Sequence, residues 1–119
     1  MGKSILRDQS YQFAIVVVKV SRALQHDQKE FVLSKQLLRS GTAIGALLRE
    51  AEFGQSKADF INKINIALNE ANESNYGLEL LKDTELLDET KYFEMKSHCD
   101  ELIRMMVSSL KTLRNQKEP

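Results

Sequence analysis

The sequence has few of the residues that break helices or cross-link chains. Its single proline is the last residue, Pro119, and only five glycines are spread over 119 residues. This scarcity excludes a turn-rich fold and favours a helical one. The lone cysteine, Cys99, has no partner for a disulfide within the chain, and no segment has the pattern of a secretory leader. We therefore expect the protein to reside in the reducing cytoplasm.

Long hydrophobic runs and an excess of one charge are also missing. The longest apolar run, Phe13 to Val18, is far shorter than the roughly 20 residues that a membrane-spanning helix needs. The 17 basic and 17 acidic residues balance, which argues against a protein that coats nucleic acid by bulk electrostatics. The length suits one domain, residues 1–119, with a single core.

Apolar residues recur at helical spacing in four segments. The predicted helices cover residues about 7–26, 34–53, 56–82 and 88–115. The first has an apolar face made by Phe13, Val17, Val20 and Leu24. Its β-branched run could instead form a strand. We favour a helix because Lys19, Arg22 and His26 then gather on the opposite side.

The second and third predicted helices begin at serines that can act as N-caps. Ser34 would cap the second, and Ser56 with Asp59 resembles a capping box for the third. The inward side of the second helix contains Leu37, Gly41, Ile44, Leu48 and Ala51, with Gly45 near its edge. A glycine in a helix costs about 1 kcal/mol relative to alanine, so we expect this pair to allow close helix packing.

The last two helices have regular seams with alternating spacings of three and four. The third presents Phe60, Ile64, Ala67, Ala71, Ser74, Leu78 and Leu81, and the fourth presents Tyr92, Met95, Cys99, Leu102, Met106, Ser109 and Leu113. Such seams are typical of helices that pack at a shallow angle. Because the connections are short, we predict an all-α, antiparallel up-and-down four-helix bundle.

No residue pattern indicates catalysis. Glu-x-x-His pairs for a di-iron centre are absent, as are phosphate-binding glycine motifs and an activated nucleophile. We expect no metal, no cofactor, no small-molecule substrate and no enzymatic activity, although elemental analysis would test a metal-dependent enzyme. Cys99 is predicted to be a core residue. Glu70 and Glu73 of the third helix, and Arg39, Arg49 and Glu50 of the second, are expected to form ion pairs between helices or with another subunit, with acid–base chemistry of the carboxylates as the alternative.

Two stripes of weakly polar residues point away from the predicted core. The third helix presents Asn62, Asn65, Asn69, Asn72 and Tyr76 opposite its apolar seam, and the second presents Leu38, Thr42 and Ala46. Asparagine is a poor helix former, and a solvated face would normally be charged. We interpret both stripes as an oligomer interface. The alternative is a face that is simply exposed to solvent.

Basic residues suggest a second hypothesis. Arg104, Lys111, Arg114 and Lys117 lie near the end of the fourth helix, with no acid between residues 102 and 117, and Lys19 and Arg22 could add to them. Such an edge could bind nucleic acid, but cations also favour helix C-termini through the macrodipole. No aromatic residues alternate with these charges as in a single-strand stacking site.

The chain resembles the four-helix-bundle family named after proteins encoded in intervening sequences of 23S ribosomal RNA genes. The resemblance covers residues 10–113 and rests on four pieces: Gln36-Leu37-Leu38-Arg39-Ser40-Gly41-Thr42-Ala43-Ile44-Gly45-Ala46, Arg49-Glu50-Ala51, Ser56-Lys57-Ala58-Asp59-Phe60 and Ile66-Ala67-Leu68-Asn69-Glu70-Ala71. It implies a ring-shaped homopentamer without catalytic activity. The accessory variability-determinant proteins of diversity-generating retroelements are similar, which implies binding of RNA or DNA and of a nucleic-acid enzyme.

From these observations we expect a self-assembling binding or scaffold module. Its partner would be further copies of the same chain. The alternative is a nucleic-acid-binding ring that acts as an accessory to a nucleic-acid enzyme.

Overall fold

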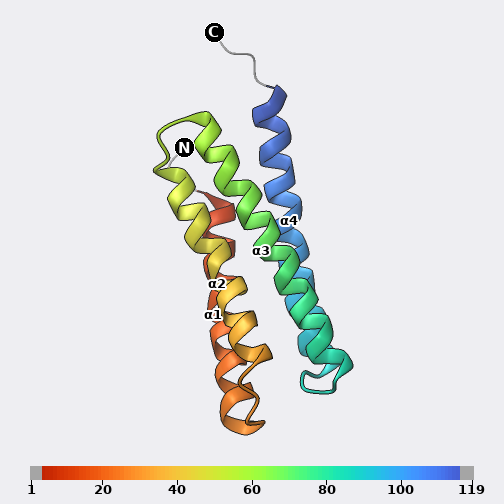
Figure 1. Ribbon diagram of the computed structural model, residues 1–119. Helices are drawn as coiled ribbons and strands as arrows, with labels where there is room; N and C mark the ends of the chain where they lie inside the picture. The colour runs from red at the N-terminus through yellow and green to blue at the C-terminus, as the bar shows by residue number, and fades with distance from the viewer. Residues whose placement is uncertain (1–3, 116–119) are drawn as a thin grey trace.

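The computed structural model describes residues 4–115 and contains four α-helices and no strand in that range. They are α1 (Ile5–Asp27), α2 (Leu33–Glu52), α3 (Lys57–Asp83) and α4 (Glu89–Asn115). Consecutive helices run in opposite directions along a rod of 55 × 21 × 21 Å (Figure 1). The predicted up-and-down bundle is confirmed, and the β-branched run lies within α1.

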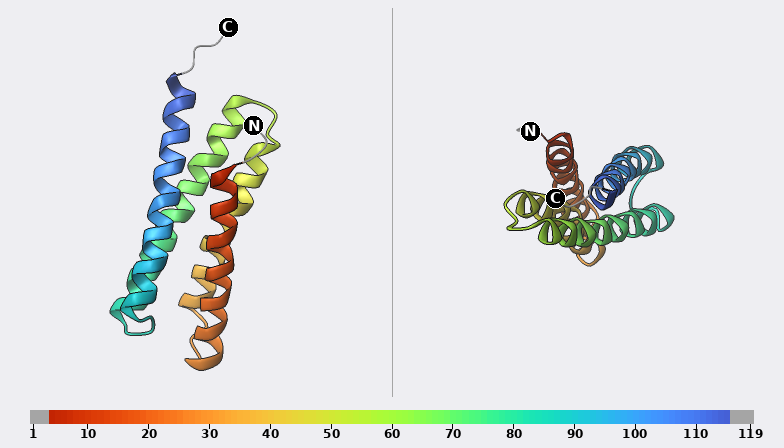
Figure 2. Two further views of the ribbon diagram at one scale, coloured as in Figure 1. Left: turned by 180° about the vertical axis from the view of Figure 1, so that it is seen from behind. Right: turned by 90° about the horizontal axis from the view of Figure 1, so that it is seen from above.

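Each helix packs against two others. Neighbours in sequence are neighbours in space, and α4 closes the bundle against α1. The view down the rod shows the α1–α2 hairpin beside the α3–α4 hairpin, and the two hairpins diverge toward the end that carries their turns (Figure 2). The outer sides of α2 and α3 therefore stay open to solvent or to another molecule.

The helix starts follow from their caps, and one prediction of a cap is wrong. The Ser4 hydroxyl accepts a hydrogen bond from the Arg7 N–H at 3.0 Å, so α1 starts earlier than predicted. The third helix is capped as predicted, because the Ser56 hydroxyl accepts from the Asp59 N–H at 3.0 Å. Ser34, however, does not cap α2, which starts one residue earlier at Leu33.

Glu30 takes the capping role at α2. Its carboxylate accepts hydrogen bonds from the backbone N–H groups of Val32, Leu33 and Ser34 at 3.2, 2.9 and 2.8 Å. Burial raises the pKa of Glu30, but these N–H donors outweigh it and hold the pKa below its usual value. The Ser34 hydroxyl is turned inward, where it donates to the Glu30 carbonyl oxygen and accepts from the Gln25 amide.

The predicted seams form the core. On α3 every predicted member except the half-buried Phe60 is buried, and on α2 all five inward residues are buried. On α4 the prediction holds through Met106, but Leu110 is then buried in place of Ser109. A straight α-helix drifts by about 20° per heptad, so a continued three-four spacing leaves the core near the end. On α1, Val20 is only half-buried.

The two glycines of α2 lie against α1. A Cβ atom at Gly41 would approach Cγ2 and Cγ1 of Val17 to 2.8 and 2.9 Å. At Gly45 the nearest atoms would be the hydroxyl and carbonyl oxygens of Ser10, at 3.4 and 3.6 Å. The expected close approach of the helices is confirmed, and it is tighter at Gly41.

We predict that Gly41→Ala and Gly45→Ala change stability in opposite directions. Overpacking costs about 1–3 kcal/mol, and at Gly41 this exceeds the gain of about 1 kcal/mol in helix propensity. At Gly45 the added Cβ atom would make only ordinary van der Waals contacts, so the higher helix propensity of alanine should stabilise this variant. Urea denaturation monitored by circular dichroism gives both free energies of unfolding. A Gly41→Ala variant as stable as the wild type would contradict the close packing.

Candidate functional site

The outer side of α3 is a second regular seam. Asn62, Asn69, Asn72 and Tyr76 are exposed and Asn65 is half-buried, all opposite the core seam as predicted. Their spacings of three and four extend to the exposed Glu79. Within residues 4–115 none of these four asparagine side chains forms a hydrogen bond with another residue. A helix with two such seams can pack against a partner on each side.

A neighbouring asparagine behaves differently. The Asn75 amide faces α4 and donates to the Asp100 carboxylate at 2.9 Å. Lys96 donates to the same carboxylate at 2.9 Å. Burial raises the pKa of Asp100, but the hydrogen bonds from Lys96 and Asn75 outweigh it and lower the pKa overall. Asn75 is thus held within the chain through its amide nitrogen, unlike the four asparagines of the outer seam.

The predicted stripe on α2 faces the α1 side of the bundle. Ala46 is exposed and Thr42 is half-buried. The Thr42 hydroxyl donates to the Leu38 carbonyl oxygen at 2.7 Å, so its hydrogen-bonding capacity is used within the helix. Leu38 differs from the expectation, because it is half-buried and packs against the core instead of pointing fully outward.

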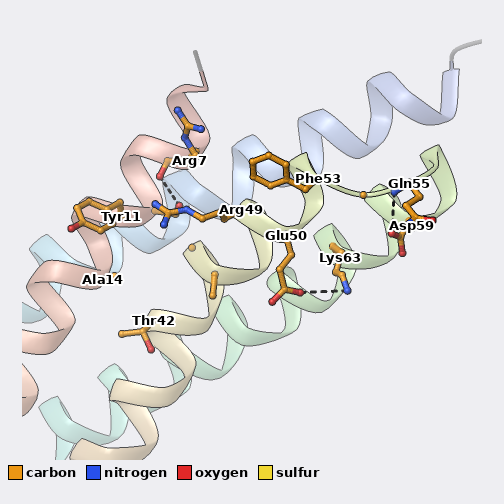
Figure 3. Close-up of a pocket in the computed structure, with 14 residues that line it drawn as sticks. Arg7, Tyr11, Ala14, Thr42, Arg49, Glu50, Phe53, Gln55, Asp59 and Lys63 are labelled. Carbon is orange, nitrogen blue, oxygen red and sulfur yellow. Dashed lines mark hydrogen bonds and ion pairs between the residues drawn. The ribbon is translucent and has the colours of Figure 1, made fainter. Parts of the chain in front are cut away.

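A groove of about 850 Å³ lies on this face, between α1, α2 and the start of α3. Tyr11 and Phe53, which are 56% and 79% exposed, stand on its sides, and Gly45 and Ala46 contribute small surfaces (Figure 3). Arg49 also lines it. Sequence patterns did not predict the groove or its two aromatic residues. A signal was available, because Tyr11 lies off the apolar stripe of α1 and Phe53 follows the last residue of α2.

Charges in and around the groove are mostly paired. Arg7 and Glu52 connect α1 to α2 at 3.0 Å, and Lys63 and Glu50 connect α3 to α2 at 3.4 Å. Arg49 is exposed and forms no ion pair with the described residues. The expected ion pair within the chain is thus found for Glu50 but not for Arg49, which stays a free cation near two exposed aromatic rings.

A charged edge separates the two stripes. The Arg39 guanidinium contacts the Glu73 carboxylate at 2.7 Å and the Glu70 carboxylate at 3.3 Å. The hydrogen bond with Glu73 and the charge of Glu70 raise the pKa of Arg39. These residues form interhelical ion pairs, one of the two arrangements expected. Because this edge bridges α2 and α3, the asparagine seam and the groove lie on different faces of the bundle.

The comparisons with known proteins agree with this architecture. Residues 3–108 match the family described as 23S rRNA-intervening sequence protein. The chain belongs to this family. It is also similar to the crystal structure of a protein of unknown function from the S23 ribosomal protein family of Bacteroides thetaiotaomicron, with 50% identity and a TM-score of 0.89. That match covers 90% of this chain and 99% of the other. No protein with a curated function matches this chain significantly.

Residues proposed to bind nucleic acid do not form one patch in this member of the 23S rRNA-intervening sequence protein family. Lys19 and Arg22 are exposed in the second half of α1, whereas Lys111 and Arg114 lie at the far end of α4 (Figure 1). Arg104 is paired with Glu101, one turn earlier. The acid-free stretch of residues 102–117 therefore does not leave Arg104 unpaired, because its partner lies just before that stretch. Lys117 lies outside the described residues.

The described residues offer few centres for chemistry. Residues 4–115 contain no group of three or more side chains that could hold a metal ion, and no helix among them is long and apolar enough to span a membrane. Cys99 is 0% exposed, and its thiol donates to the Ala71 carbonyl oxygen at 3.4 Å. Burial raises the pKa of Cys99 to about 12. A thiol in this environment is not a nucleophile at neutral pH.

We predict that Cys99 does not react with a thiol reagent such as dithionitrobenzoate while the protein is folded. Burial hides the sulfur, and the raised pKa keeps it protonated. Absorbance at neutral pH should show no labelling in buffer and complete labelling in denaturant, which serves as the control. Rapid labelling of the folded protein would contradict the core assignment.

Proposed function

We propose that the protein is a non-enzymatic, self-assembling module that forms a ring of identical subunits and acts as a binding or scaffold component in the cytoplasm. The observation that carries this proposal is the second seam of α3. A seam of regular spacing, with four asparagines that lack partners in the described chain, is better explained by contact with another subunit than by solvation alone.

The separation of the two stripes favours a ring over a symmetric pair. A symmetric dimer uses the same surface on both subunits, whereas a contact between different surfaces leaves one of each free on every subunit. Further copies then add until the ring closes. The asparagine seam and the α1–α2 groove are such a pair of different surfaces. The family resemblance suggests five subunits.

We predict that the protein in solution has a mass that is a multiple of 13.6 kDa, with a pentamer near five times that value, or about 68 kDa. Size-exclusion chromatography with light scattering measures this mass directly. Dilution over a wide concentration range serves as the control against nonspecific aggregation. A mass of one chain at every concentration would contradict self-assembly.

Nucleic-acid binding is the second candidate, and a specific observation favours it. Lys19 and Arg22 are exposed on α1, form no ion pair with the described residues, and have no acidic residue between Asp8 and Asp27. A ring would repeat this basic surface once per subunit. Repetition raises the effective concentration of binding sites along a nucleic acid, which would suit an accessory to a nucleic-acid enzyme.

We predict for this candidate that Lys19→Glu/Arg22→Glu weakens binding of a fluorescent single-stranded RNA and lowers its salt dependence. Each lost phosphate contact reduces the slope of log affinity against log salt by roughly 1. Fluorescence anisotropy between about 50 and 200 mM salt gives this slope. Lys91→Glu, which removes a cation already paired with Glu94, is the matched control. Absence of binding at low salt, or binding unaffected by salt, would contradict this candidate.

A further inference from the structure

The middle parts of three helices carry charges of one sign. Between Asp8 and Asp27 the only charged residues are Lys19 and Arg22, apart from His26. Between Glu30 and Glu50 they are Lys35, Arg39 and Arg49. Between Lys63 and Lys82 of α3, by contrast, they are Glu70, Glu73 and Glu79. The middle parts of α1 and α2 are thus purely basic, and the middle part of α3 is purely acidic.

Two basic residues of α2, Lys35 and Arg49, lie on the side of the helix that contributes to the groove. Lys35, Thr42 and Arg49 are spaced by seven residues and so lie along one side of α2. Two of them, Thr42 and Arg49, line the groove. Lys35 and Arg49 are exposed and form no ion pair with the described residues. The nearby acids Glu50 and Glu52 are already paired with Lys63 and Arg7, and Asp59 of α3 lines the far end of the groove. Lys35 and Arg49 are thus the unpaired cations on this side of α2.

The acidic residues of α3 adjoin its asparagine seam. Glu79 follows Asn72 by seven residues and extends the seam toward the α3–α4 turn. It is exposed and forms no ion pair with the described residues. Glu70 and Glu73 share one cation, Arg39. The outer face of α3 therefore keeps a net negative charge.

The two surfaces also fit in form. Residues 62 to 79 of α3 span about 26 Å at the rise of an α-helix, and the groove residues from Thr42 to Phe53 span about 17 Å of that length. The groove offers small residues, Gly45 and Ala46, between exposed rings, while the seam offers amides and Tyr76. Amide and aromatic side chains of a helix fit a shallow groove with a small-residue floor.

We propose that the outer seam of α3 in one copy packs into the α1–α2 groove of a second copy. This inference rests on the proposed self-assembly and names its two surfaces. Lys35 and Arg49 of one copy face the acidic side of α3 in the next, as Arg39 already faces Glu70 and Glu73 within the chain. The exposed rings of Tyr11 and Phe53 lose solvent contact on docking.

Electrostatics disfavours the symmetric alternatives. A contact between two grooves would place Lys35 and Arg49 against their own copies, and a contact between two seams would oppose Glu73 and Glu79. Like charges across an interface are destabilising. The groove-to-seam contact brings the unpaired cations Lys35 and Arg49 to the acids of α3, and this contact is directional.

Two arginine substitutions at exposed positions test the proposal without altering the core. Ala46→Arg fills the groove, and Asn69→Arg adds bulk and a positive charge to the seam. Each variant alone should have the mass of one chain by light scattering. The Ala46→Arg chain keeps its seam and the Asn69→Arg chain keeps its groove. An equimolar mixture should therefore form complexes of one chain of each variant and no larger assembly. Arg49→Glu should also reduce the mass, by charge alone.

Matched controls place the same substitution elsewhere. Ala23→Arg and Gln12→Arg lie at exposed positions of α1 outside the groove, and both should keep the wild-type mass. Far-ultraviolet circular dichroism checks that every variant is folded.

The outcomes separate this proposal from the proposed function. If the wild type has the mass of one chain, self-assembly fails and this inference fails with it. If the wild type assembles but Ala46→Arg or Asn69→Arg leaves its mass unchanged, only the groove-to-seam contact is overturned. The same holds if the mixture does not associate. If Arg49→Glu abolishes RNA binding while the mass stays the same, the groove is a nucleic-acid surface and the proposal is wrong.

Discussion

The close approach of α2 to both of its sequence neighbours is the constraint on which the rest of the structure depends. Toward α1, Gly41 leaves space for Val17. Toward α3, the buried Ser74 hydroxyl donates to the Ser40 hydroxyl at 2.9 Å. Any larger residue at these contacts would push a helix outward and open the core. Small residues on α2 also leave the outer α1–α2 surface shallow, so the same constraint that packs the bundle forms the groove.

A rod of four helices leaves much helical surface outside its core. In α3 that surface has regular spacing, amide side chains and acids, whereas the α1–α2 hairpin has small residues, exposed rings and unpaired cations. The two surfaces are complementary in charge, which gives a physical reason for contact between copies of the chain.

The sequence predicted what depends on periodicity and missed what depends on contacts between distant residues. The core seam of α3 could be predicted from the sequence because its spacing is regular over most of the helix. The cap of α2 could not be predicted in this way. The Glu30 carboxylate, rather than the Ser34 hydroxyl, accepts the hydrogen bonds of the first backbone N–H groups, and this depends on the folded turn before α2. The groove joins Tyr11 to Phe53 across two helices, so no local pattern contains it. The asparagine stripe could be recognised from the sequence, but not which of the nearby charges stay unpaired after folding, since the partners of Arg39 and Glu50 lie on another helix.

The central claim is that the outer seam of α3 is covered by another copy of the chain. Electron paramagnetic resonance of a nitroxide attached to Asn69→Cys tests this most directly, because the buried Cys99 leaves the new thiol as the reactive one. The account predicts an immobilised spectrum that becomes mobile when Ala46→Arg is added to the labelled chain. A mobile spectrum for the labelled protein without Ala46→Arg, in a sample whose mass shows it to be assembled, would contradict the claim.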